Sequence, residues 1–193
     1  MNIAIINYGA GNIQSIKFAI QRLGHEAVLT DQAQAIRSAD KVIFPGVGEA
    51  GSAMRKLKNT GLDTVIPTLT QPVLGICLGM QLMCTRSAES DAQGLGIFDT
   101  EVIRFSDALK VPQIGWNTLE AVKGPLFDQV ADEEFIYMVH SYYAPLCECT
   151  VASCTYGVSY SAALQKDNFF GTQFHPEKSS LTGNQILKNF LAL

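Results

Sequence analysis

The chain has 193 residues, the length of one ordinary domain, so we expect a single unit spanning residues 1–193. Of these residues 47% are hydrophobic and 17% are charged, which is enough apolar material for a sizeable core. The net charge of −4 and the scattered lysines and arginines argue against a nucleic-acid-binding surface and against a basic membrane-surface patch.

The first half of the chain alternates strand and helix patterns. Residues 2–7 form a continuous apolar run, which is typical of a buried parallel strand. Apolar residues then recur at helical spacing as far as Gly24, which can end that helix. Further strands are expected at 27–29, 41–44 and 73–74, and further helices at 32–38 and 49–58. This βαβα series predicts an α/β fold with an open, mostly parallel sheet and helices on both faces.

The strand pattern at 73–74 leads into Gly75-Ile76-Cys77-Leu78-Gly79, the most informative stretch of the chain. A cysteine stands between glycines at i−2 and i+2, ahead of a helix-forming run. This is the strand–turn–helix layout of a nucleophile elbow, in which glycines avoid clashes in tightly packed backbone. A helix N-terminus favours a thiolate, so the pattern predicts Cys77 as a nucleophile, while the alternative is a small packed core residue.

The segment Phe44-Pro45-Gly46-Val47-Gly48 follows an expected strand at the edge where open α/β sheets bind ligands. It could be an ordinary glycine turn before a helix. An elbow hydrolase, however, needs two backbone N–H donors for the tetrahedral oxyanion. One would come from Leu78, and the other from Val47 if Gly46 lets the intervening peptide turn inward.

The second half of the chain changes character after the break at residues 94–96. Shorter β-like runs are expected at 101–103, 118–122, 135–139, 150–156 and 162–165, followed by a strong strand at 169–174 and a closing helix at 181–193. Antiparallel strands are therefore expected to extend or flank the parallel sheet.

Phe174-His175-Pro176-Glu177 follows the last strong strand pattern. Proline disfavours helix at the residue before it, so His175 should stay extended. Side chains at i and i+2 of an extended segment point the same way, which puts the Glu177 carboxylate beside the His175 ring. Cys77, His175 and Glu177 would then form a nucleophile–base–orienter triad.

These three segments, taken together, resemble the class-I, triad-type glutamine amidotransferase family. The resemblance spans nearly the whole chain and implies the flavodoxin-like fold of that family. Finer features are similar to one member: Asn-Tyr-Gly-Ala-Gly-Asn at 7–12, Ile-Gly-Trp-Asn at 114–117, His-Ser-Tyr-Tyr at 140–143 and His-Pro-Glu-Lys-Ser-Ser at 175–180.

The resemblance implies that Cys77 attacks the side-chain amide of glutamine, that His175 protonates the departing ammonia, and that water releases glutamate. The implied partner is a (β/α)₈ cyclase subunit, which forms a heterodimer with the chain and uses the ammonia to make imidazole glycerol phosphate in histidine biosynthesis. Residues implied to hold glutamine are Gly46, Gly48, Gln81, Glu89, Ser141 and Tyr142. Residues implied to lie near the partner are Trp116, Tyr137 and Lys178. No cofactor is implied.

The resemblance also implies that a free glutaminase is held nearly silent until its partner is loaded. Gly46 and Gly48 would permit a peptide flip that points the Val47 N–H away from the site or into it. Losing one oxyanion donor costs on the order of 10²–10³ in rate, so Gly46→Ala should disturb this switch.

Other candidate motifs are weaker. Gly9-Ala10-Gly11 lacks the third glycine of a dinucleotide fingerprint. Cys147, Cys149 and Cys154 lack paired metal-ligand spacing, so no metal site is expected; alternation on a strand would account for Cys147 and Cys149 facing the same way.

Cys84 is expected in the core, His25 at a helix cap or the surface, and His140 at substrate or interface contacts. Five cysteines without a framework of spacings fit free thiols in a reducing cytoplasm, and no signal peptide or membrane-spanning run is expected.

Two other interpretations are carried with the first. One is a glutaminase subunit of another synthase, of the anthranilate type, although such proteins usually have histidine where Met80 stands. The other is a non-enzymatic, thiol-bearing binding module with a flavodoxin-like fold. Hydrolysis of glutamine in the presence of candidate synthase subunits would separate the three.

Overall fold

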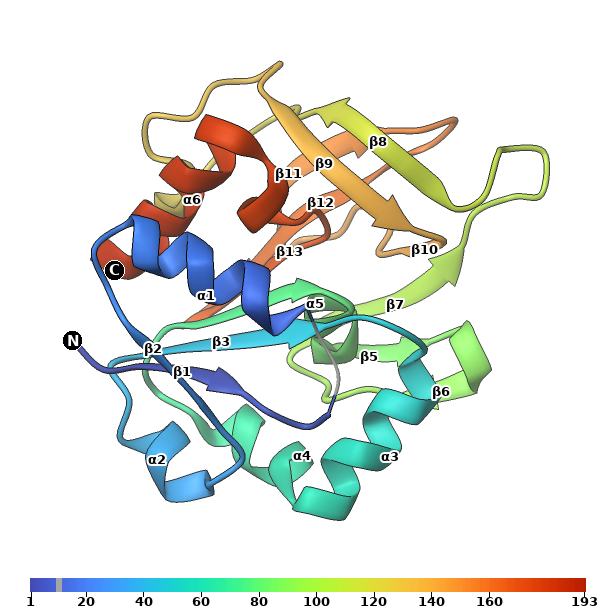
Figure 1. Ribbon diagram of the computed structural model, residues 1–193. Coiled ribbons are helices and arrows are strands. Elements are labelled where there is room, and N and C mark those ends of the chain that lie inside the picture. The colour runs from blue at the N-terminus through green and yellow to red at the C-terminus, as the bar shows by residue number, and fades with distance from the viewer. Residues whose placement is uncertain (10–11) are drawn as a thin grey trace.

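A central sheet with helices on both faces forms the body of the protein in the computed structural model, which describes residues 1–9 and 12–193 (Figure 1). The expected α/β fold class, with a mostly parallel sheet and added antiparallel strands, is confirmed. The expected Gly9-Ala10-Gly11 turn includes Ala10 and Gly11, which lie outside the described residues.

Among the described residues, the central sheet has seven strands, in the order β11 (Thr150–Thr155), β12 (Ser159–Lys166), β13 (Phe169–Thr172), β4 (Val73–Cys77), β3 (Lys41–Gly46), β1 (Ile3–Ile6) and β2 (Ala27–Thr30). The strands from β13 to β2 run parallel, while β11 and β12 are antiparallel additions at one edge. Alternating residues of β1 face opposite sides, as the two-residue period of a strand requires.

Two hydrophobic clusters fill the spaces above and below this sheet. One cluster joins Ile3 and Ile5 to the helices α1 (Ile13–Arg22) and α6 (Ser180–Ala192). The other cluster joins Ala4 and Ile6 to the remaining helices. These are α2 (Ala33–Arg37), α3 (Ala50–Thr60), α4 (Leu62–Val65) and α5 (Leu78–Met83). Short 3₁₀ turns occur at η1 (Ile66–Thr68), η2 (Glu89–Asp91), η3 (Pro125–Phe127) and η4 (Pro176–Lys178).

Two smaller sheets complete the fold. One has the order β10 (Tyr142–Tyr143), β7 (Phe98–Arg104), β5 (Cys84–Ser87) and β6 (Ala92–Gln93). The other is an antiparallel pair of β8 (Gln113–Thr118) and β9 (Phe135–His140), which lies near α6 (Figure 1). Of the helices among the described residues, none is long and apolar enough to cross a membrane.

Two sequence-based expectations about the second half were wrong. The expected strand at 118–122 is displaced, because β8 ends at Thr118 and Ala121 takes a positive φ of 52° that turns the chain. Glu120 keeps only an isolated bridge to Ser153. Cys147 and Cys149 do not alternate on a strand, since they lie in the turn before β11.

Three adjacent strands, β3, β4 and β13, end side by side at the middle of the central sheet. Gly46 at the end of β3 is paired with Cys77 at the end of β4, and Thr172 at the end of β13 is paired with Ile76. The carboxyl ends of parallel strands in an open sheet form the usual ligand-binding edge. The fold therefore brings the three sequence motifs to one place.

Candidate active site

Cys77 occupies a strained turn between β4 and α5. Its backbone has φ 54° and ψ −112°, and the helix begins at the next residue, Leu78. A positive φ is rare for a residue with a side chain and is typical of the nucleophile at a strand-to-helix elbow. The thiol is largely buried, and its Sγ lies 3.8 Å from the carbonyl oxygen of Val139.

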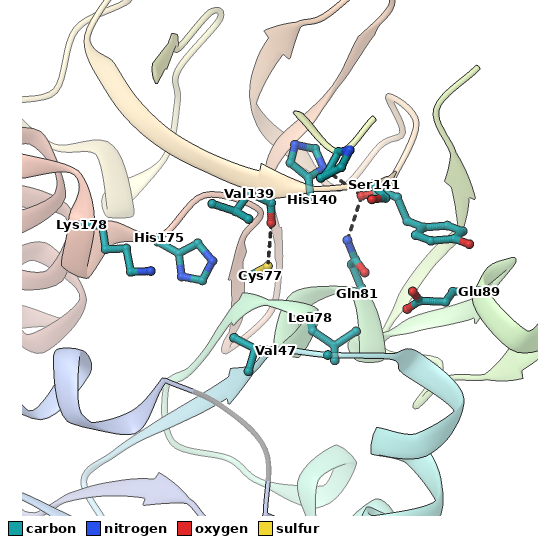
Figure 2. A pocket seen from close by; sticks show the side chains of 13 residues that line it. Val47, Cys77, Leu78, Gln81, Glu89, Val139, His140, Ser141, His175 and Lys178 are labelled. Carbon is teal, nitrogen blue, oxygen red and sulfur yellow. Dashed lines mark hydrogen bonds between the residues drawn. The ribbon is translucent and has the colours of Figure 1, made fainter. Parts of the chain in front are cut away.

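His175 lies beside Cys77 (Figure 2). It is held by its own backbone and by Glu177. Its N–H donates to the carbonyl of Tyr137 at 3.1 Å, which ties the segment to β9. The residue is extended, and the turn that starts at Pro176 brings Glu177 Oε1 to 2.9 Å from His175 Nδ1. The two side chains are 6% and 0% exposed, so this pair is shielded from water.

The surroundings of the two buried histidines give them opposite charge states. Burial by itself lowers the pKa of His175, but hydrogen bonding with the Cys77 thiol and with Glu177 outweighs it and raises this pKa to about 10. The pKa of His140 is lowered to about 4, mainly by burial; a hydrogen bond with Tyr142 O raises this pKa, and the nearby His175 lowers it. At neutral pH His175 therefore carries a proton that it can give, while His140 is uncharged.

A cavity of about 300 Å³ opens at Cys77, which is large enough for a small molecule. Eleven of the residues singled out in the sequence line it: Val47, Gly48, Cys77, Leu78, Gln81, Glu89, His140, Ser141, Tyr142, His175 and Lys178. Pro112 and Val139 complete the lining. Glu177 does not line it and lies behind His175.

The far wall of the cavity carries the polar side chains that could hold a ligand. In Figure 2, Gln81 and Glu89 lie on the other side of Cys77 from His175 and Lys178. Gln81 Nε2 donates to Tyr142 O at 2.8 Å, so that carbonyl is already in use within the protein. Glu89 Oε2 accepts from the N–H of Ala50 at 2.8 Å, and the half-buried carboxylate therefore meets the N-terminus of α3.

The glycines next to Val47 differ in their surroundings, which corrects the expectation about Gly46. Gly46 lies within β3, and a Cβ built there would fall 2.5 Å from Gly79 N and 2.8 Å from Leu78 Cβ. Gly48 has a positive φ of 101° and open space around it. Gly46→Ala would therefore disturb the packing of the elbow, and the room for a backbone reorientation lies at Gly48.

The residues expected at a partner surface lie at or beyond the rim of the cavity. Trp116 on β8 is 54% exposed, and its ring meets that of Tyr137 on β9 edge-on at 5.6 Å. Lys178 is exposed and lines the cavity. Neither Trp116 nor Tyr137 reaches the lining.

The other cysteines stand apart from this site. All five are free thiols: Cys84 and Cys154 are buried, as is Cys77, while Cys147 and Cys149 are half-buried. Burial raises the pKa of the Cys84 and Cys154 thiols, which makes them poor nucleophiles. Within residues 1–9 and 12–193, no cluster of histidine, cysteine or carboxylate side chains is arranged to hold a metal ion.

Two residues in contact with Cys77 were missed in the sequence. Val139 contributes a backbone carbonyl, for which a sequence carries no signal. Gln173 donates from Nε2 to Cys77 Sγ at 3.7 Å. It stands two positions before His175, so extended alternation could have placed both side chains on one side.

Comparison with known proteins finds a matching family and relatives along the full length of the chain. The family model for glutamine amidotransferase class-I matches residues 4–193. The chain is 54% identical over its full length to the whole of an imidazole glycerol phosphate synthase subunit HisH from Bacteroides thetaiotaomicron. It is 47% identical, again over the full length of both chains, to the protein of that name from Pectobacterium atrosepticum.

Solved structures with much lower identity share the fold. One glutamine amidotransferase matches with a TM-score of 0.77 and 18% identity, covering 98% of this chain and 97% of that one. PurLQS from Thermotoga maritima contains a chain that matches with a TM-score of 0.74 and 16% identity, covering 99% and 97%.

Proposed function

Because this chain belongs to the class-I glutamine amidotransferase family, we propose that it is the glutamine-hydrolysing subunit of an imidazole glycerol phosphate synthase, in histidine biosynthesis. The observation that carries the catalytic part is that Cys77 and His175, whose ring is paired with the buried Glu177, line one cavity. The full-length likeness to HisH proteins supports the synthase assignment.

In the first step the Cys77 sulfur attacks the side-chain amide carbon of glutamine and forms a tetrahedral intermediate. The N–H groups of Val47 and Leu78 are proposed to stabilise its oxyanion, a contribution on the order of 10²–10³ in rate for one donor. His175 then gives its proton to the amide nitrogen, the C–N bond breaks, and ammonia leaves. Glu177 holds Nδ1 of the ring and stabilises the imidazolium.

In the second step water attacks the thioester. His175, now neutral, takes a proton from the water, and the C–S bond breaks to release glutamate and restore the Cys77 thiolate beside the protonated His175. Gln81 and Glu89 are proposed to bind the amino-acid end of glutamine with the backbone at Ser141 and Tyr142 and with Gly46 and Gly48. Gln81 offers a free carbonyl and Glu89 a carboxylate, and both suit an ammonium group.

The ammonia is proposed to pass to a (β/α)₈ cyclase subunit bound in a heterodimer, with Trp116, Tyr137 and Lys178 at the interface.

The full-length relatives favour this synthase over one of the anthranilate type, and the amidotransferase family model argues against a non-enzymatic binding module. Five free cysteines agree with a reducing, cytoplasmic setting, and residues 1–193 are proposed to act as one catalytic domain.

The test separates glutamine hydrolysis from the synthase reaction. With the cyclase subunit present, Cys77→Ala should lower glutamine-dependent synthesis by more than about 10⁴-fold, because the nucleophile is gone. Synthesis from added ammonium salt should be unchanged. Cys147→Ala, which removes a half-buried thiol outside the cavity, is the matched control and should keep both activities. Glutamine-dependent synthesis that survived in Cys77→Ala would refute the nucleophile, and absence of a complex would refute the partner.

A further inference from the structure

Gln173 is a fully buried glutamine that contacts both the nucleophile and the proposed substrate-binding glutamine. It follows β13, and its side chain lies between Gln81 and Cys77. Its Oε1 accepts from Gln81 Nε2 at 2.8 Å, and its Nε2 donates to Cys77 Sγ at 3.7 Å. Burying a primary amide is costly unless its polar atoms are paired, and here its partners are cavity groups.

The direction of these hydrogen bonds is fixed by a backbone carbonyl. Tyr142 O can only accept, so the group of Gln81 that faces it must be the NH₂, which donates to it at 2.8 Å. The second N–H of that NH₂ group points at Gln173, which must then present its oxygen. The remaining end of the Gln173 amide is the NH₂ group, and it faces the sulfur. A flip of either amide would set two donors or two acceptors against each other.

The Val139 carbonyl and the Gln173 N–H act on the sulfur in opposite directions, beside the His175 imidazolium, which also favours a thiolate. The Val139 carbonyl can accept a hydrogen bond from the Cys77 thiol but repels a thiolate. The Gln173 N–H does the reverse, because a hydrogen bond to an ionised acceptor is about twice as strong as one to a neutral acceptor. The amide of Gln173 therefore favours the charged, reactive form of the nucleophile.

We propose that Gln173 is a positioning residue, which fixes the orientation of Gln81 toward the substrate and stabilises the Cys77 thiolate by donating a hydrogen bond to Sγ. This inference rests on the proposed function, since it gives Gln173 a role only if Cys77 is the nucleophile. It links substrate binding to nucleophile activation through one buried side chain. With both N–H groups of Gln81 in use, only its Oε1 is left for the ligand.

The test is the rate at which iodoacetamide alkylates Cys77 as a function of pH, followed by mass spectrometry of the peptide that carries Cys77. Gln173→Met has a similar length but no donor, and should slow alkylation at neutral pH by about 10- to 100-fold and move the pH profile to higher pH. Gln173→Glu keeps an acceptor for Gln81 and loses the amide donor. It should slow alkylation as well, with a smaller rise in the KM for glutamine than Gln173→Met gives.

Asn189→Leu is the matched control, because it also removes a buried amide, one that bonds to Leu126 O and Asp128 O away from the cavity. It should change stability without moving the alkylation profile. If Cys77 of the unchanged protein reacts no faster than Cys147, the proposed function fails. If Cys77 is reactive and the alkylation profile of Gln173→Met overlies that of the unchanged protein, the proposed role of Gln173 is refuted. Circular dichroism spectra of all variants check that the proteins compared are folded.

Discussion

At the scale of single residues, the chemistry of this site depends on how His175 keeps its proton. Hydrogen bonds from two sides outweigh the effect of burial and raise its pKa to about 10. The ring is then an imidazolium at neutral pH, next to the cysteine that it would serve. Glu177 Oε2 has no hydrogen-bond partner among the described residues, so His175 is the group that offsets the burial of this carboxylate.

The first prediction concerns Glu177→Gln. A histidine whose pKa is raised on folding adds stability that is complete below its unfolded pKa near 6.5 and is lost as pH rises through about 10. As pH rises through about 10, His175 should lose its proton, and the rate of glutamine hydrolysis should fall with it. Removing the carboxylate lowers the pKa of His175, so the alkaline limb of the rate profile should move to lower pH and kcat should fall at least about tenfold. Initial rates of glutamate release across neutral and alkaline pH measure this, and an alkaline limb that does not move would contradict it.

The candidate site was predictable from the sequence where the chemistry is carried by side chains in local patterns. Cys77 between glycines and His175 two positions before Glu177 are visible as spacing, because a tight turn and an extended segment fix local geometry. Gln173 and the Val139 carbonyl were not predicted. Gln173 is 96 residues from Cys77 in the sequence and Val139 is 62 residues from it. Only the assembled central sheet and the β8–β9 pair bring these residues together.

At the scale of elements, the elbow depends on how closely β3, β4 and α5 approach one another. A Cβ at Gly79 would lie 1.9 Å from the carbonyl oxygen of Phe44 on β3. A Cβ at Gly75 would lie 2.4 Å from Met83 Cε and 2.8 Å from Met80 N. The glycines on both sides of Cys77 are therefore required by packing between elements, and backbone atoms at these contacts cannot move aside as a flexible side chain could.

The second prediction follows from this contact. Gly79→Ala should lower the free energy of unfolding by about 3 kcal/mol, because the added methyl forces α5 away from β3. Gly24→Ala is the matched control: it has a positive φ of 82° and open space, so backbone strain alone should cost about 1 kcal/mol. Chemical denaturation of both variants measures the two costs, and an equal loss would show that close packing at the elbow is not the cause.

Among the elements, the first half of the chain was predicted better than the second. β1, β3 and β4 are buried on both faces and appear as apolar runs, whereas β5 has the sequence Cys-Thr-Arg-Ser and carries no such signal. β8 was misplaced because Ile114 and Trp116 are exposed on it and Gly115 interrupts it. Its pairing with β9 comes from tertiary structure, which local propensity does not encode.

At the scale of the whole molecule, the β8–β9 pair connects an outer surface to the candidate active site. Ile114, Trp116 and Phe135 are more than half exposed on this pair, while the end of β9 supplies His140 and Val139 to the cavity. Tyr137 in the same strand accepts from His175 N and donates from its own N–H to Ser179 Oγ at 2.9 Å. A partner that bound the outer surface would thus contact a strand that is hydrogen-bonded to the segment that carries His175.

The third prediction tests that surface. Trp116 is a large exposed ring packed on Tyr137, and such aromatic residues commonly dominate the binding energy of an interface. If the cyclase subunit binds here, Trp116→Ala should weaken the complex by about 2 kcal/mol, which is about a 30-fold rise in Kd. Val28→Ala, which trims a 65% exposed side chain on the edge strand β2, is the control and should leave the Kd unchanged. Isothermal titration calorimetry with the cyclase subunit measures the Kd of both variants. Equal Kd values would show that the interface does not include Trp116 on the β8–β9 pair.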